Sequence, residues 1–116
     1  MTIGNYISAV RVKLSDTVQP YRYQPSEIAD QLRAALWRAR QMRPSLCYAD
    51  GRLVQVDADV NFGAAVSTVV RPELDRYFDG LVMLAAAGVV ENDTGDKVDI
   101  ALAERWRTQG QGIIVA

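Results

Sequence analysis

Residues 23–44 read YQPSEIADQLRAALWRARQMRP, and this stretch decides the fold that the sequence predicts. Its apolar residues recur at spacings of three and four, which places them on one face of an α-helix. They are Ile28, Leu32, Ala35, Leu36, Ala39 and Met42. Pro25 suits the first helical position, where its missing N–H is no loss, and Pro44 pushes the residue before it out of the helical region. We therefore expect an amphipathic helix between the two prolines.

Three further helices are expected from similar patterns, at about Ile3–Leu14, Pro72–Val90 and Lys97–Gln109. Thr2 is placed to cap the first of them, and Ser15 with Asp16 ends it. Four residues of the last helix are expected to face the core: Val98, Ala101, Leu102 and Trp106. The predicted fold class is all-α, a bundle of about four helices.

The helical period disappears between the second and third predicted helices, at about residues 45–71. Arg52–Val56 and Val66–Val70 are short β-branched segments that predict either a β-hairpin arm or a long loop. An isolated hairpin is only marginally stable, so we expect a partner surface to order this arm. Asp57 and Asp59 near its centre suggest a cation site, although a solvated loop tip explains them more simply.

The last seven residues, 110–116, read GQGIIVA, which is loosened by glycine and then apolar. Such a segment either packs back on the domain or docks on another chain. The predicted organisation is a helical domain over residues 1–109, followed by a docking tail over residues 110–116. If that hypothesis holds, deleting Ile113–Ala116 leaves the helices intact and abolishes assembly.

The composition excludes several classes of protein. The 116 residues suffice for one domain with a modest core, and the formal net charge of −1 supplies no basic field for nucleic acid. The longest apolar run, Gly80–Val90, is too short to span a bilayer. The first residues lack the basic and then apolar layout of a signal peptide. We therefore expect a protein made in the cytosol without targeting and without membrane contact.

The sequence offers little for catalysis. Histidine is absent, which excludes Ser–His and Cys–His pairs and removes the commonest metal ligand. The glycine-rich patterns that cradle phosphates do not occur. The single cysteine, Cys47, is interpreted as a small buried residue in preference to a reactive thiol. We therefore expect no catalytic residue, no cofactor and no metal site, and the chain is not expected to be an enzyme.

Arginines gather on the second predicted helix, on or near its outward side. They are Arg33, Arg38, Arg40 and Arg43, with Trp37 among them. A basic recognition helix of a DNA-binding protein has this character. Arginine and tryptophan are also favoured anchors of subunit interfaces. Both interpretations stay open on the residues alone.

The order of elements resembles the small head-to-tail adaptor (connector) proteins of tailed bacteriophages. The segments that carry the resemblance are MTIGNYISAVRVKLSDT, YRYQPSEIADQLRAALWRARQMRPSL and RPELDRYFDGLVMLAAAGVV. In that family an aromatic residue and a polar cap precede a helix that begins acidic and ends near Arg-Pro. Here these are Tyr23, Gln24, Glu27 and Arg43-Pro44. Gln24 departs from the better Ser, Thr or Asp cap.

The resemblance implies a non-enzymatic all-α subunit of the virion. Such adaptors form a ring, commonly of twelve copies, between the portal protein and a tail or stopper protein, and double-stranded DNA passes through without sequence-specific binding. A loop and a C-terminal segment become ordered on docking. The expected interface residues are Arg33, Trp37, Arg40, Leu53, Val54, Val56, Val69, Ile113, Ile114 and Val115. The alternative is a small helical DNA-binding or regulatory protein that uses the arginines of the second helix.

Overall fold

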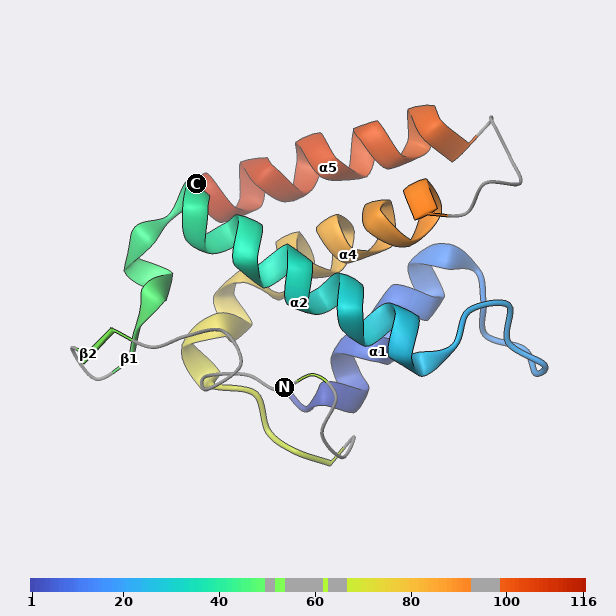
Figure 1. The fold of residues 1–116 in the computed structure, drawn as a ribbon, viewed down its shortest axis with the longest axis horizontal. Coiled ribbons are helices and arrows are strands. Elements are labelled where there is room, and N and C mark those ends of the chain that lie inside the picture. The colour runs from blue at the N-terminus through green and yellow to red at the C-terminus, as the bar shows by residue number, and fades with distance from the viewer. Residues whose placement is uncertain (50–51, 54–61, 63–66, 93–98) are drawn as a thin grey trace.

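A computed structural model describes residues 1–49, 52–53, 62, 67–92 and 99–116 of the chain. Within these residues the all-α fold class predicted from the sequence is confirmed (Figure 1). The α-helices are α1 (Ile3–Leu14), α2 (Pro25–Met42), α4 (Phe78–Asn92) and α5 (Asp99–Val115). Two 3-10 helices, Pro44–Cys47 and Pro72–Tyr77, and two short strands, β1 (Tyr48–Ala49) and β2 (Arg52–Leu53), complete the described elements.

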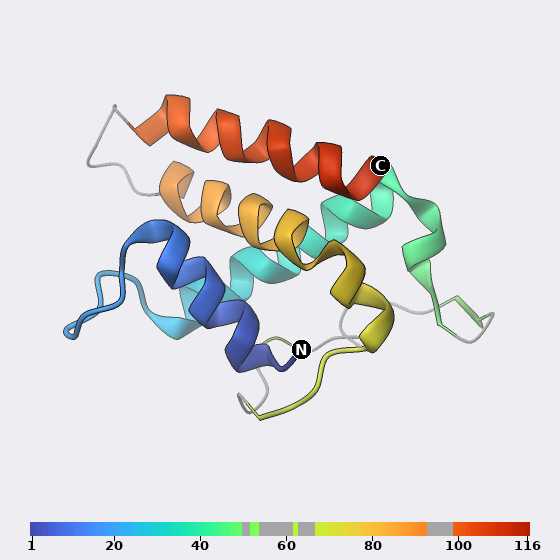
Figure 2. The same ribbon diagram turned by 180° about the vertical axis from the view of Figure 1, so that it is seen from behind.

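Helix α4 lies at the centre of the molecule. Helix α2 crosses in front of it and α1 lies behind it, while α5 runs along another of its sides (Figures 1 and 2). Its sequence explains this position, because nearly every residue from Gly80 to Val90 is apolar or small and is buried. A helix that is apolar almost all round is stable in water only when other elements cover it.

Both ends of α1 follow local signals in the sequence. The Thr2 hydroxyl accepts a hydrogen bond from the backbone N–H of Asn5 (3.2 Å), and the Asn5 side chain accepts one from the backbone N–H of Thr2 (2.8 Å). This reciprocal cap satisfies two donors that a helix N-terminus leaves without partners. The helix ends at Ser15, which adopts a left-handed conformation with φ of 56°. The predicted bounds and N-cap of this helix are confirmed.

Helix α2 begins at Pro25 as predicted, and its Glu27 carboxylate accepts a hydrogen bond from the backbone N–H of Gln24 (3.2 Å). The predicted apolar stripe is buried from Ile28 to Ala39, and only Met42 at its end is half-buried. Tyr6 of α1 joins the same core and packs edge-on against Phe62 and Phe78, with ring centroids 5.5 and 4.7 Å away. Burial raises the pKa of the Tyr6 phenol, and the charge of Asp75 raises it further.

The predicted third helix is divided into two parts. Pro72–Tyr77 is a 3-10 helix, and the α-helix begins only at Phe78. Side chains three residues apart share one side of a 3-10 helix, so Leu74 and Tyr77 are both buried by it. The fourth predicted helix is displaced as well, because α5 continues past Gln109 to Val115. Trp106 faces the core as expected, Ala101 is exposed instead, and Val98 lies outside the described residues.

For residues 45–71 the sequence left two alternatives, a hairpin of the two β-branched segments or a long loop, and the described residues show a different pairing. Arg52–Leu53 pairs antiparallel with Tyr48–Ala49, in the register Tyr48↔Leu53 and Ala49↔Arg52. Closing a connection of two residues costs less chain entropy than closing the nine residues between the two β-branched segments. Val69 instead forms a bridge with Thr2, and the Val70 N–H donates to the Met1 carbonyl (2.9 Å). Asp57 and Asp59 of the predicted arm lie outside the described residues.

Candidate interaction surface

The outward side of α2 carries the clearest candidate for an interaction surface. Four exposed residues recur there at helical spacing, and we call them the α2 face: Ala34, Trp37, Arg38 and Gln41. Trp37 stands out because 59% of its surface is exposed to solvent. A large aromatic side chain left in water on a well-packed helix is the kind of residue that anchors protein interfaces.

The other arginines on or next to α2 are less exposed to solvent than Arg38. Arg40, predicted to face outward, is buried with only 5% of its surface exposed. It follows the buried Leu36 by four residues, so the helical period puts it on the inner side. Arg33 is half-buried and forms an ion pair with Asp30 at 3.1 Å. Of the predicted basic cluster, only Arg38 is fully exposed.

Arg43 ties the end of α2 to the end of α5. Its Nε donates a hydrogen bond to the Ile114 carbonyl (2.7 Å), and its Nη2 donates one to the Ala116 carbonyl (2.6 Å). Cations stabilise a helix C-terminus because its last carbonyl groups have no partners within the helix. The guanidinium also lies 5.4 Å from the centroid of the Tyr77 ring. Arg43 therefore serves the fold of the monomer.

The predicted docking tail is helical and partly buried, which corrects the expectation of a flexible segment. Ile113 is half-buried and Ile114 is completely buried, whereas 56% of the Val115 surface is exposed. Gly110 marks the place where α5 crosses α4 closely, since a β-carbon there would lie 2.9 Å from the Gly80 carbonyl oxygen. Glycine serves close packing at this position. Of the three predicted tail residues, only Val115 is fully exposed.

Only some of the interface residues predicted in the arm lie within the described residues. Leu53 lies in β2, while Val54 and Val56 lie outside the described residues. Val69 is exposed over 65% of its surface beside the N-terminus, far along the chain from Trp37. Arg71 holds the base of this region, because its Nη1 donates to the Tyr48 carbonyl (2.6 Å).

A second surface was not singled out by sequence reasoning. It comprises Ser8 and Val12 on α1 and Asp79 and Met83 on α4, two helices that pack against each other (Figure 2); we call it the α1–α4 face. Ser8, Val12 and Asp79 are exposed, Val12 over 68% of its surface, and Met83 is half-buried. One feature of the sequence could have revealed it. Asp79 and Met83 lie one turn apart in a helix whose other residues are mostly small or aliphatic.

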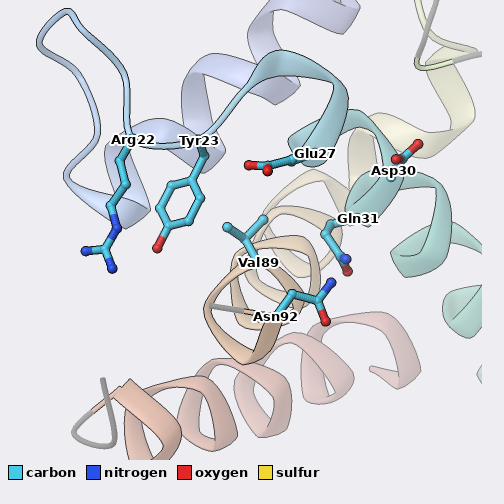
Figure 3. Close-up of a pocket in the computed structure, with 7 residues that line it drawn as sticks. All are labelled: Arg22, Tyr23, Glu27, Asp30, Gln31, Val89 and Asn92. Carbon is cyan, nitrogen blue, oxygen red and sulfur yellow. The ribbon is translucent and has the colours of Figure 1, made fainter. Parts of the chain in front are cut away.

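A hollow of about 400 Å³ lies between the beginning of α2 and the end of α4 (Figure 3). Its lining residues are Arg22, Tyr23, Glu27, Asp30, Gln31, Val89 and Asn92. Its two carboxylates already have partners, since Glu27 caps α2 and Asp30 pairs with Arg33. In Figure 3 the Asp30 carboxylate points away from Val89 at the floor of the hollow. The two carboxylates of the lining therefore serve the fold of α2.

A buried ion pair holds the connection between α1 and α2. Arg11 Nη1 lies 3.0 Å from Asp16 Oδ2, and the Asp16 carboxylate also accepts hydrogen bonds from the backbone N–H groups of Arg22 (2.8 Å) and Tyr23 (3.1 Å). Burial alone would raise the pKa of Asp16, but these N–H groups and the Arg11 charge outweigh it and hold that pKa below its ordinary value. Asp16 is therefore a structural anion.

Two searches of the described residues bear on other classes of function. They contain no group of three or more His, Cys, Asp or Glu side chains arranged to hold a metal ion. None of the helices among them has the length and apolar character needed to cross a membrane. In comparisons with known proteins, no family model, curated protein or solved structure matches the chain.

Proposed function

We propose that this chain is a non-enzymatic structural subunit of a phage virion. In this proposal, copies assemble into a ring, of twelve in the form that the resemblance implies, at the head–tail junction. The ring joins the portal protein to a tail or stopper protein, and double-stranded DNA passes through without sequence-specific contacts. No cofactor or membrane takes part. The observation that carries the proposal is the exposed indole of Trp37 on the outer side of a helix whose inner side is fully packed.

The arrangement of the exposed surfaces supports assembly into a ring. A ring forms from heterologous contacts, in which one surface of a subunit binds a different surface of the next. The α2 face and the α1–α4 face belong to different helices packed on α4, and each carries an exposed apolar residue, Trp37 or Val12 (Figures 1 and 2). A formal net charge of −1 also suits a channel through which DNA slides without sticking.

The alternative function, DNA binding by the arginines of α2, has less support. Arg40 is buried, Arg43 is committed to the carbonyl groups at the end of α5, and Arg33 is paired with Asp30. Neutralising several phosphates with exposed cations is what supplies affinity for DNA. Helix α2 presents only Arg38 fully to solvent, which is too few for such a footprint.

The test measures mass by light scattering and images the chain bound to its candidate portal protein by cryo-electron microscopy. We expect a ring coaxial with the portal that persists in high salt, because apolar contacts are not screened by ions. A chain that ignores the portal and instead shifts a DNA band, with steep loss of binding as salt rises, would contradict the proposal and favour the alternative.

A further inference from the structure

We propose that the α2 face of one copy packs against the α1–α4 face of the next copy, head to tail. This inference rests on the proposed function and identifies the contact that builds the ring. It differs from the sequence prediction, which placed docking in the arm and the tail.

The α2 face combines an apolar anchor with a positive charge. Trp37 provides a large exposed indole, and Ala34 one turn before it leaves room for a neighbour to approach. Arg38 is exposed and makes no ion pair among the residues that the structure describes. Tryptophan and arginine are the residue types most enriched at the energetic centres of interfaces.

The α1–α4 face combines apolar side chains with a negative charge. Gly80 and Leu84 lie against α5, and Gly88 lies against Gln31 of α2, so these contacts cover two sides of α4. Asp79 and Met83 lie one turn apart on a different side of the same helix. Asp79 is exposed and has no ion-pair partner in the described part of the chain. Val12 of α1 adds an exposed apolar side chain.

Charge decides between a head-to-tail contact and a symmetric one. Two copies joined through identical α2 faces would bring two Arg38 side chains toward each other, and two α1–α4 faces would do the same with Asp79. Like charges at an interface are unfavourable, whereas Arg38 against Asp79 is complementary. A second copy of the chain therefore satisfies both faces at once. Because the two faces differ and share no residue, each subunit can bind two neighbours.

The test inactivates one face at a time and measures mass by light scattering over a range of concentrations. We expect the wild-type chain to form species larger than a dimer, and Trp37→Glu and Asp79→Arg each to weaken self-association about 30-fold. Mixed in equal amounts, the two variants still offer one intact face each. The mixture should therefore give a dimer of twice the 12.8 kDa chain mass that does not grow further.

A charge exchange and a matched control separate the loss of this contact from the general effect of any charge-changing substitution. The double variant Arg38→Asp with Asp79→Arg should recover association that either single change loses, because the opposite charges still meet. The variant Glu104→Arg on the exposed side of α5 should change nothing. Circular dichroism and the unfolding midpoint of every variant confirm that the fold is intact.

The outcomes that would overturn the inference are distinct from failure of the proposed function. Rings that form on the portal equally well with every variant would disprove this contact and leave the proposed function standing. An Asp79→Arg variant that forms homodimers as well as wild type does would show a symmetric α2 contact instead. A wild-type chain that stays monomeric at millimolar concentration would also overturn the inference, and its failure to assemble on the portal would overturn the proposed function.

Discussion

Asp16 shows how one buried carboxylate organises a connection that has no regular structure. Its side chain accepts hydrogen bonds from Arg22 and Tyr23 and pairs with Arg11, whose own Nη1 also donates to the Tyr23 carbonyl (3.0 Å). Arg11 further lies 3.9 Å from the centroid of the Tyr21 ring. The network positions the start of α2 relative to the end of α1. Removing one partner from such a network leaves the others buried without compensation.

We expect Asp16→Asn to lower the free energy of unfolding at pH 7 by about 2–4 kcal/mol, because the charge of Arg11 stays buried without its counter-ion. Asp30→Asn is the matched control, since Asp30 is exposed and its pair with Arg33 should contribute less than about 1 kcal/mol. Urea unfolding of both variants and the wild type gives the comparison. Equal losses at the two positions would contradict the structural role of Asp16.

The difference in unfolding free energy between wild type and Asp16→Asn should depend on pH, because the pKa of Asp16 is lowered in the folded state. Because the folded-state pKa lies below the unfolded value of about 3.9, the carboxylate contributes stability above the unfolded pKa. This contribution is lost as the pH falls through the folded pKa. The gap between wild type and Asp16→Asn should therefore be constant from pH 5 to 7 and close below pH 4 as far as the wild type stays folded. A gap that widens in acid would contradict the lowered pKa.

At the scale of elements, the two glycines of α5 have opposite roles. A β-carbon at Gly110 would lie 2.9 Å from the Gly80 carbonyl oxygen and 3.1 Å from Leu84 Cγ, whereas a β-carbon at Gly112 meets nothing within 4 Å. Both positions are helical. The sequence alone treats them alike, as two glycines that loosen a tail, and only the packing of α5 on α4 separates them.

We expect Gly110→Ala to destabilise the fold by about 1–3 kcal/mol, because the added carbon forces α5 away from α4. Gly112→Ala should instead stabilise it by up to about 1 kcal/mol, since alanine favours an exposed helical position over glycine. Thermal or urea unfolding of the two single variants measures both effects. Similar destabilisation by both substitutions would mean that the crossing of α4 and α5 is placed wrongly.

At the scale of the whole molecule, the end of α5 belongs to the core of the monomer. Ile114 is completely buried, and Arg43 of the α2 terminus donates to its carbonyl group. Deleting Ile113–Ala116 should therefore cost about 3–5 kcal/mol in unfolding free energy, comparable to removing a large buried side chain. The sequence alone predicts that the deletion leaves the helices intact and abolishes assembly. Because the deletion also removes core packing, a loss of assembly would not show that these residues dock.

Val115 provides the cleaner test of docking at this end of the chain. Its side chain is exposed over 56% of its surface, so Val115→Glu should change stability by less than about 0.5 kcal/mol. The contact proposed above leaves Val115 outside the interface, and portal assembly of this variant should equal that of wild type. Light scattering of the portal mixture measures it. Loss of assembly with an unchanged unfolding midpoint would return docking to the end of α5.

The sequence by itself determined where the first two helices lie and most of the apolar residues that they bury. Local signals suffice for this, because the Thr2 cap, Pro25 and the apolar period act on neighbouring residues. The exposed position of Trp37 follows from the same period. The end of α5 was not predictable in this way, because two glycines predict a break unless a neighbouring helix requires them.

Only the tertiary structure decided the fate of Gly110 and Ile114. Each depends on an element distant in sequence, since α4 lies against Gly110 and Arg43 binds the carbonyl group of Ile114. The same holds for the α1–α4 face, which exists because α2 and α5 cover other sides of α4 and leave Asp79 exposed. Local patterns specify the helices, and the packing between them determines which surfaces remain for a partner.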